Sequence, residues 1–204
     1  LAEPQKLDQF LDQIFSKLDM KISIKTRIGT HYEEDWEYLL AIYEKYPIHE
    51  LIIHPRIQTD MYRGVPRLGA YEKAVNRLKM PLCYNGNLFS AADYKRITER
   101  FPDTCCFMYG RGLITNPGLV TEIREGIRPD KKTVREFHDC LFEEYRELLS
   151  GERNVLFRMK ELWSYMAVNF TNYEKYAKKI KKSQHLSEYS SVVSSLFAEQ
   201  DLID

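Results

Sequence analysis

Four short apolar segments that alternate with amphipathic helices constrain the fold of this chain more than any other feature. The segments begin near residues 21, 51, 82 and 105, so successive starts lie about 23 to 31 residues apart. This is the length of a strand, a helix and their connections. Such alternation predicts a parallel sheet covered by helices, and therefore an α/β fold class. Two architectures have this pattern: a doubly wound open sheet and a (β/α)8 barrel.

Periodicity gives the expected elements their approximate bounds. Apolar residues recur at intervals of three and four over 7–18, 33–43, 71–78 and 90–101, which predicts helices there. Short apolar runs predict strands over 21–25, 51–54, 82–84 and 105–108. Beyond Gly126 the alternation stops, and helices are expected over 133–149, about 156–166, 173–180 and 186–197. We therefore expect two domains, residues 1–126 and residues 127–204, of which the second is all-helical.

Polar and basic residues gather where these strands end. They are Lys25 and Arg27, His54 and Arg56, Asn85, and Gly110 and Arg111. Each alone has an ordinary interpretation, as a solvated charge, a half-buried histidine or a turn. In a barrel the carboxyl ends of the strands converge on one site, whereas in an open sheet four consecutive ends would lie in a row. Together the residues favour a barrel that binds an anionic, ring-bearing cofactor.

The segment from Gly110 to Gly112 is the clearest candidate for an anion site. The two glycines that flank Arg111 let backbone come close to a ligand, and the guanidinium offers a fork of donors that fits a phosphate. Asn116 and Pro117 predict that a helix starts just downstream. An ordinary tight turn with a solvated arginine explains this segment, taken alone, equally well.

Local charge says more about partners than total charge. The 30 Lys and Arg residues balance the 30 Asp and Glu residues of the whole chain. Residues 152–182, however, hold eight basic and three acidic residues, a net charge of +5, with aromatic residues interleaved. A basic, aromatic helical surface can follow an RNA backbone and stack on exposed bases. A helical cap with core aromatics and solvated lysines is the other interpretation.

Cysteine usage and hydropathy bear on location. The four cysteines have no metal-ligand spacing, so no metal site is predicted. Cys83 and Cys105 lie in apolar runs, which is typical of buried, reduced thiols in a cytoplasmic protein. There is neither a recognisable signal peptide nor an apolar run of membrane-spanning length, so we expect no membrane contact. Because the chain begins with Leu1 inside a helical pattern, we also consider that an N-terminal portion precedes it.

In order and spacing, several motifs resemble those of the tRNA-dihydrouridine synthases. They are Lys25-Thr26-Arg27-Ile28-Gly29, His54-Pro55-Arg56 with Met61-Tyr62-Arg63-Gly64, Pro81 to Asn87, and Met108-Tyr109-Gly110-Arg111-Gly112 with Asn116-Pro117. The resemblance covers about residues 1–125 well and the later helices more loosely. It implies a flavin-dependent (β/α)8 barrel followed by a helical domain. The implied activity is reduction of uridine in tRNA to 5,6-dihydrouridine with FMN and NADPH.

The resemblance also assigns roles to residues of this chain. Lys25 would contact the flavin ring, His54 the flavin region, Asn85, Gly86 and Asn87 other parts of FMN, and Gly110 and Arg111 its phosphate. The candidate RNA contacts are Arg56, Arg158, Lys160 and Lys178. For the cofactor the physical chemistry agrees, because a cation stabilises an anionic reduced flavin and backbone N–H groups with an arginine bind phosphate.

Three departures from the family pattern stand out. Pro55 stands where the family usually has glycine or alanine, and Asn87 stands where it usually has an acidic residue. The four strands resemble strands 5 to 8 of the barrel, and nothing corresponds to strands 1 to 4. In the family those early strands carry the rest of the FMN site and the cysteine that protonates uridine. None of the four cysteines stands in that motif, so we assign no catalytic residue here.

The sequence is therefore interpreted as the C-terminal half of such a synthase, with the second half of a (β/α)8 TIM barrel followed by an all-α tRNA-binding domain. Half a barrel exposes two parallel edges, so we expect this chain alone to be inactive and to self-associate. Two other functions stay open. One is another FMN-dependent barrel oxidoreductase acting on a small molecule, which would not need the basic helices. The other is a non-catalytic RNA-binding fragment, which would retain tRNA without binding flavin.

Overall fold

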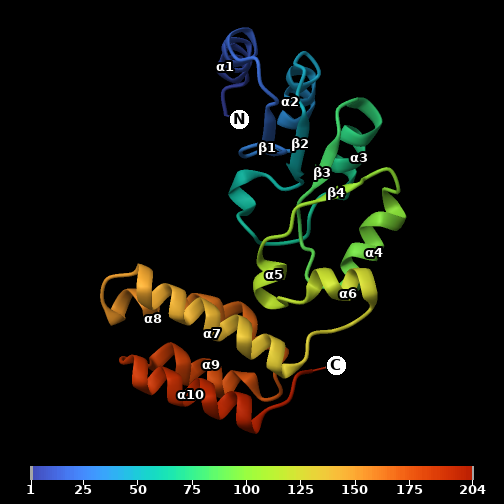
Figure 1. The fold of residues 1–204 in the computed structure, drawn as a ribbon. Coiled ribbons are helices and arrows are strands. Elements are labelled where there is room, and N and C mark those ends of the chain that lie inside the picture. Colours follow the sequence, from blue (N-terminus) through green and yellow to red (C-terminus); the bar gives the residue numbers. More distant parts are fainter. Residues whose placement is uncertain (1, 204) are drawn as a thin grey trace. The chain divides into compact units, whose positions relative to one another are not determined.

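The computed structural model describes residues 2–203, and in its first half strands alternate with helices (Figure 1). The elements are α1 (Pro4–Lys17), β1 (Ser23–Arg27), α2 (Asp35–Tyr43), β2 (Glu50–His54), a 3-10 turn (Gln58–Asp60), α3 (Leu68–Arg77), β3 (Leu82–Tyr84), α4 (Ala91–Arg100) and β4 (Cys106–Phe107). The chain divides into two compact units. The sheet unit comprises the residues up to Leu88 together with Lys95–Tyr109, and the helical unit comprises Phe89–Tyr94 and the residues from Gly110.

The four strands form one parallel sheet in the order β1-β2-β3-β4. Strand order that follows chain order is the order within a (β/α)8 barrel, whereas a doubly wound sheet reverses direction at its switch point. The expected parallel sheet is thus confirmed, as part of a mixed α/β fold. One face of the sheet packs on helices: Leu51 and Ile53 of β2 and Tyr84 of β3 are buried in one core with Trp36 and Leu39 of α2.

The last strand is shorter than the sequence predicts. Only Cys106 and Phe107 pair with β3, so β4 has two residues rather than the four expected over 105–108. Cys105 lies outside this ladder and is exposed, which corrects the expectation that it is a buried thiol. Cys83, in the middle of β3, is buried as expected. The difference arises because an apolar run does not by itself say how many residues find a partner strand.

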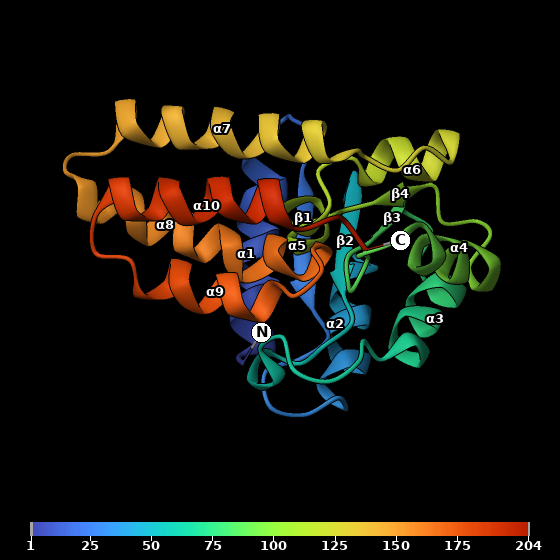
Figure 2. The same ribbon diagram turned by 90° about the horizontal axis from the view of Figure 1, so that it is seen from below.

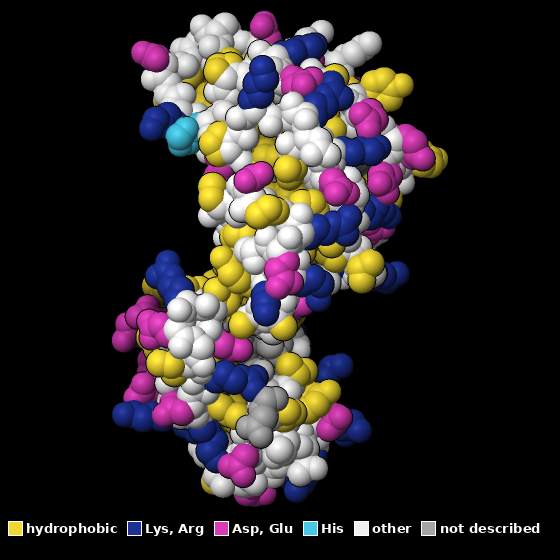
Figure 3. Space-filling model, turned by 90° about the vertical axis from the view of Figure 1, so that its right-hand side faces the viewer, with side chains coloured by type: hydrophobic (Ala, Val, Ile, Leu, Met, Phe, Trp, Pro, Cys, Tyr) yellow, Lys and Arg dark blue, Asp and Glu magenta, His cyan; other side chains and the backbone are white. Residues whose placement is uncertain are grey.

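The outer helices of the sheet unit carry mixed charges. Figure 3 shows Lys and Arg side chains interspersed with Asp and Glu over α3 and α4. Ion pairs on these helices join Lys73 to Glu37, Arg77 to Glu44 and Arg100 to Glu72, at N···O distances of 2.7, 2.7 and 3.2 Å. Exposed pairs like these each contribute only about 0 to 1 kcal/mol. Their main consequence is that this face presents no surface of a single sign.

The helical unit holds the remaining elements, and Figure 2 shows its four long helices lying side by side. The elements of this unit are α5 (Arg111–Thr115), α6 (Leu119–Glu125), α7 (Lys131–Leu148), α8 (Glu152–Met166), a 3-10 turn (Ala167–Asn169), α9 (Tyr173–Lys182) and α10 (Leu186–Glu199), and the four long helices are α7 to α10. Because α5 packs against α8, this unit starts near Gly110, earlier than the domain boundary expected after residue 126. Among residues 2–203, no helix combines the length and apolar composition that crossing a membrane requires.

A directed chain of hydrogen bonds crosses the core of the helical unit. Trp163 Nε1 donates to the Tyr189 hydroxyl at 2.7 Å, and that hydroxyl lies 2.6 Å from His138 Nε2. His138 Nδ1 lies 2.7 Å from the Asp139 carboxylate. Since the hydroxyl accepts from Trp163, it can donate to Nε2, which leaves Nδ1–H to donate to Asp139. With His138 neutral, the indole N–H, the hydroxyl and both imidazole nitrogens therefore each have a hydrogen-bond partner.

Candidate functional site

The candidate site is built on the face of the sheet that the helices do not cover. Side chains alternate across a strand, so residues that pair in register share a face. The register joins Lys25, Ile52, Cys83 and Cys106 into one row across the four strands. Asn85, two residues beyond Cys83, lies on the same face nearer the carboxyl end of the strands. Two of the residues predicted from the sequence, Lys25 and Asn85, therefore lie on the same face of the sheet.

Asn85 links both edges of the sheet. Its Oδ1 accepts a hydrogen bond from Lys25 Nζ at 2.9 Å, and its Nδ2 donates to the Met108 carbonyl at 2.8 Å. These two bonds fix the orientation of the amide and hold the ammonium group of Lys25 at the carboxyl end of the sheet. Partial burial, and then the neighbouring Arg27 cation, lower the pKa of Lys25 below its usual value. The result is a positioned donor on an otherwise uncovered face.

Arg27, at the end of β1, holds the loop that follows β2. Arg27 donates through Nη1 to the Ile57 carbonyl at 2.8 Å and through Nη2 to the Met61 carbonyl at 2.9 Å. Its guanidinium also lies over the Tyr62 ring, 5.7 Å from the ring centre. Sequence reasoning placed Arg27 at a strand end but missed this clamping role. No signal in a single sequence shows that two loop carbonyls 30 and 34 residues away converge on it.

Arg56 is not available to RNA, which corrects the sequence-based expectation. Its side chain has no exposed surface, although arginine is rarely buried without partners. The guanidinium donates to the carbonyls of Arg63 and Gly64 at 3.1 and 2.5 Å. Further bonds go to His54 Nε2 at 3.1 Å and Asn87 Oδ1 at 3.2 Å. Arg56 therefore organises the loop after β2 from within, and this accounts for its place in the motif.

The structure brings His54, Arg56 and Asn87 together as one group. Because arginine can only donate, His54 Nε2 must accept, so the ring is the neutral Nδ1–H tautomer. His54 is buried and stacks on Tyr62, with 6.2 Å between ring centres. Asn87 has a left-handed backbone, with a φ of 30°, and presents its amide oxygen to Arg56. The amide thus occupies a place where an acidic residue would form an ion pair.

Gly110 and Arg111 lie in the helical unit, directly after the last residues of the sheet unit. A Cβ added at Gly110 would meet no heavy atom within 4 Å, so its backbone is open to a ligand. Arg111 is the first residue of α5, and its guanidinium lies over the ring of Phe89, 5.3 Å from the ring centre. The flanking Gly112 is buried. The structure therefore places a short helix, rather than an extended loop, at the predicted anion site.

The helix predicted to start at Asn116 and Pro117 begins later, at Leu119. Asn116 instead ends α5, and its Oδ1 accepts from the Gly118 backbone N–H at 3.0 Å. Its Nδ2 donates to Glu122 Oε2 at 2.7 Å. The residue pair is thus a turn that joins two helices, because an asparagine can satisfy backbone groups in a turn as readily as at a helix start.

The basic helices α8 and α9 present only part of the predicted surface. Arg158 and Lys178 are exposed, whereas Lys160 donates to the Ser183 carbonyl at 2.5 Å and so helps to close the end of α9. Of the six aromatic residues interleaved with the charges, Trp163, Phe170 and Tyr176 are buried in the core of the unit. Those three cannot stack on bases. Phe157, with 67% of its surface exposed, can.

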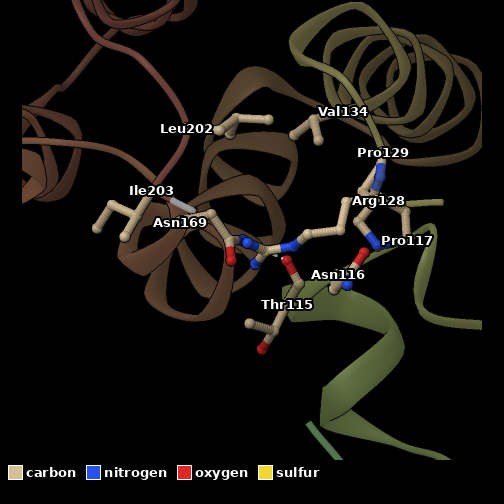
Figure 4. A pocket seen from close by; sticks show the side chains of 9 residues that line it. All are labelled: Thr115, Asn116, Pro117, Arg128, Pro129, Val134, Asn169, Leu202 and Ile203. Atoms are coloured by element: carbon tan, nitrogen blue, oxygen red, sulfur yellow. Dashed lines mark hydrogen bonds between the residues drawn. The ribbon is translucent and has the colours of Figure 1, made fainter. Parts of the chain in front are cut away.

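A small pocket lies in the helical unit, beside the turn at Asn116 and Pro117 (Figure 4). Its lining residues are Thr115, Asn116, Pro117, Arg128, Pro129, Val134, Asn169, Leu202 and Ile203. Arg128 extends across it toward Asn169, whose Nδ2 donates to the Thr115 carbonyl at 2.5 Å. Its volume of about 110 Å³ is room for a few water molecules. It is too small for a flavin or a nucleotide, because cofactor sites measure about 300 to 1,000 Å³.

Comparison with known proteins gives consistent results. The family model described as "Dihydrouridine synthase (Dus)" matches residues 1–200. The chain is 26% identical over 133 residues to tRNA-dihydrouridine synthase B of Pasteurella multocida, a match that covers 64% of this chain and 39% of the relative. It is 29% identical over 152 residues to the tRNA-dihydrouridine(16) synthase of Shewanella oneidensis, covering 71% and 46%. The chain thus spans less than half the length of these curated relatives.

Proposed function

Because the chain belongs to the dihydrouridine synthase family, we propose that it supplies barrel strands 5 to 8 and the helical module of an FMN-dependent tRNA-dihydrouridine synthase. Its four sequential parallel strands would make half of an eight-stranded barrel. The share of the relatives that it spans, 39% and 46%, supports the same division. The proposed reaction is reduction of uridine in tRNA to 5,6-dihydrouridine, with NADPH as the reductant.

The observation that carries this proposal is the Lys25–Asn85–Met108 network at the carboxyl end of the sheet. Active sites of barrel enzymes lie at this end of the strands. FMN, when bound, would supply the hydride-transfer chemistry. Lys25 fits it, because an ammonium held by Asn85 Oδ1 can donate to, and neutralise, a ring that becomes anionic on reduction. Asn85 is the positioning residue for that ammonium, since its own amide is fixed by the Met108 carbonyl.

The phosphate of FMN would bind to Gly110 and Arg111. At Gly110 a ligand can come close to the backbone, since a Cβ there would meet no heavy atom within 4 Å, and Arg111 adds a charged fork of donors. Gly86 and Asn87 would contribute at the end of β3, and His54 would line the flavin region, held there by Arg56, which also bonds Asn87. Each of these residues holds or orients the cofactor. We assign none of them to proton transfer, which in this proposal belongs to a cysteine on the first half of the barrel.

Binding of tRNA would use the exposed basic side chains of α8 and α9. Arg158 and Lys178 are free of the core, and α9 carries four further lysines, at positions 175, 179, 181 and 182. Neutralising backbone phosphates with such side chains gives affinity that falls steeply with salt. Lys160 would act more weakly, since its ammonium already bonds the Ser183 carbonyl.

The proposal also includes self-association of the chain through the edges of β1 and β4, because neither edge has a partner strand among the described residues.

The test uses two polypeptides. One is the 204-residue chain, and the other is a chimera in which this chain follows the part of the Pasteurella multocida relative that precedes its aligned segment. The chimera should bind FMN and produce dihydrouridine in tRNA with NADPH, as measured by mass spectrometry of digested tRNA. The 204-residue chain alone should produce none. Dihydrouridine formed by the short chain would overturn the half-barrel proposal, and a folded, flavin-free chimera would overturn the assigned flavin site.

Matched variants of the chimera separate the roles. Lys25→Met and Arg111→Ala should weaken FMN binding by at least about tenfold, whereas Arg124→Ala on the exposed side of α6 should leave it unchanged. Lys178→Glu should weaken tRNA binding and lower its salt dependence, whereas the same change at the exposed Lys132 of α7 should have a smaller effect. If reduction of a free pyrimidine proceeded without tRNA, the small-molecule oxidoreductase would be the better assignment.

A further inference from the structure

Glu50, Cys83 and Cys106 converge on the uncovered face of the sheet. One carboxylate oxygen and two Sγ atoms all lie within 4.8 Å of one another. The register explains this convergence, because Cys83 pairs directly with Cys106 across β3 and β4. Glu50 starts the neighbouring strand β2, two residues before the residue that pairs with Cys83. Sequence spacing gave no sign of this group, which only the parallel pairing of three strands assembles.

We propose that these three residues form a binding site for a thiophilic divalent cation of the zinc class. Zinc binds thiolate sulfur at about 2.3 Å and carboxylate oxygen at about 2.0 to 2.2 Å. Ligand atoms on one tetrahedral ion therefore lie about 3.5 to 3.8 Å apart, so side-chain rotations close the present spacing. Two thiolates and a carboxylate fill three positions and leave the fourth for water. Soft sulfur ligands select such an ion over magnesium or calcium, which prefer oxygen.

Protonation sets how the site would load. Burial is the main cause that raises the pKa of both the Cys83 and the Cys106 thiols above their usual value, so without an ion both are protonated. On binding, each S–H bond is broken as an S–metal bond forms, and two protons leave to solvent without any change of oxidation state. The loaded set of two thiolates, one carboxylate and a divalent ion has a charge of −1. Lys25, in the same row of side chains, carries a positive charge that offsets it.

Glu50 distinguishes this assignment from a simple pair of thiols. A disulfide between Cys83 and Cys106 would use the two sulfurs and give the carboxylate no role. The carboxylate oxygen instead lies within 4.8 Å of both sulfurs, where a small movement brings all three atoms onto one ion. A half-buried glutamate beside two thiols is what a third ligand requires. The inference concerns these residues alone and does not depend on the flavin or tRNA proposals.

The first test is a titration of the reduced 204-residue chain with Co²⁺, a spectroscopic substitute for Zn²⁺. Thiolate ligands should produce a charge-transfer band that saturates at one ion per chain and is displaced by Zn²⁺. Cys83→Ser and Cys106→Ser each remove a ligand and should lower the affinity for Co²⁺ by more than about 100-fold. Loss of a group that only supports a ligand costs about 10- to 100-fold. Cys105→Ser and Cys140→Ser, which change exposed thiols, are the controls and should titrate as the wild type does. Glu50→Gln should keep a weaker-binding thiolate spectrum.

The second test needs no variant and so does not depend on how the variants fold. Alkylation of the wild-type chain, followed by mass spectrometry, should show that Zn²⁺ protects the half-buried Cys106 and leaves Cys105 and Cys140 reactive. The absence of a charge-transfer band, or an alkylation rate of Cys106 that Zn²⁺ does not change, would overturn the proposal. An unchanged affinity in Glu50→Gln would overturn the assignment of three ligands. Ready formation of a Cys83–Cys106 disulfide in the presence of saturating Zn²⁺ would also count against it.

Discussion

Replacing Tyr189 with phenylalanine removes one oxygen atom from the centre of the helical unit. That oxygen accepts a hydrogen bond from Trp163 Nε1 at 2.7 Å and serves His138 Nε2 at 2.6 Å. All three side chains are almost completely buried, with 0, 1 and 2% of their surface exposed for Tyr189, Trp163 and His138. Water therefore cannot replace the lost hydroxyl without reopening the core. The variant isolates the value of the hydrogen-bond chain, because the ring itself stays in place.

The expected loss follows from the two groups left without a partner. Stranding a buried donor or acceptor costs about 1 to 3 kcal/mol, so the indole N–H and the imidazole nitrogen together give about 2 to 6 kcal/mol. That is a large share of the about 5 to 15 kcal/mol by which a domain is stable. For a unit of about 100 residues, even the lower bound corresponds to a melting temperature reduced by about 8 °C or more.

The assay must read the helical unit by itself, because the chain has two compact units that can unfold separately. Hydrogen exchange with mass spectrometry on peptides from α7 to α10 gives a free energy of unfolding for this unit. Peptides from β2 and α2 serve as an internal reference and should not change. The control is Tyr145→Phe, which removes a hydroxyl of α7 that makes no hydrogen bond with another of residues 2–203. Its effect should stay within about 0.5 kcal/mol.

Two results would refute this reasoning. If Tyr189→Phe changed the free energy of unfolding of α7 to α10 by no more than the control, the hydroxyl would not bridge Trp163 and His138 in solution. A double-mutant cycle with Trp163→Phe is the sharper test, since bonded partners couple by about 0.5 to 3 kcal/mol. A coupling near zero would mean that Tyr189 and Trp163 contribute independently to stability and that no hydrogen bond joins them in solution.

Further predictions concern pH, charge and backbone space. Burial lowers the pKa of His138 below its ordinary 6.5, so between the folded-state and unfolded-state pKa values the unfolded state binds more protons. The free energy of unfolding should therefore fall as the pH drops through about 6.5. Denaturant titrations at several pH values around 6.5 check this, and a free energy that does not change with pH contradicts it. Asn87→Asp gives the buried guanidinium of Arg56 an anionic acceptor and should add about 1 kcal/mol in calorimetry at neutral pH. A lower melting temperature would refute that. Gly29→Ala places a Cβ 2.3 Å from a backbone oxygen and should cost about 1 to 3 kcal/mol, whereas Gly69→Ala meets open space and should not destabilise.

The alternation of apolar strands and amphipathic helices was readable from the sequence because it follows from local geometry. Side-chain period and apolar spacing are properties of neighbouring residues, so the parallel sheet and the buried face of α2 could be predicted. The helix expected over 90–101 also has a local signal at its start, because the Ser90 hydroxyl accepts from the Asp93 backbone N–H and caps α4. The turn at Asn116 was misread, because the same side chain serves a helix start or a turn equally well.

Burial of polar residues, by contrast, was decided only by tertiary structure. Arg56 reads as a surface charge until the carbonyls of Arg63 and Gly64 and the side chains of His54 and Asn87 close around it. Half of the aromatic residues in the basic region proved to be core for the same reason, since helical packing decides which face of a helix is covered. A single sequence records which residues are present and not which of them meet.

The sequence by itself determined the strand ends as the place for chemistry, and it named Lys25 and Asn85 without showing that they touch. Only the register of the parallel strands brought them within 2.9 Å and gathered Glu50, Cys83 and Cys106 on the same face of the sheet. The physical reason is that strand pairing joins residues 23 to 31 positions apart through backbone hydrogen bonds, and so brings side chains from separate strands onto one face. Local propensity specifies each strand, but the partner, the register and hence the site belong to the folded sheet.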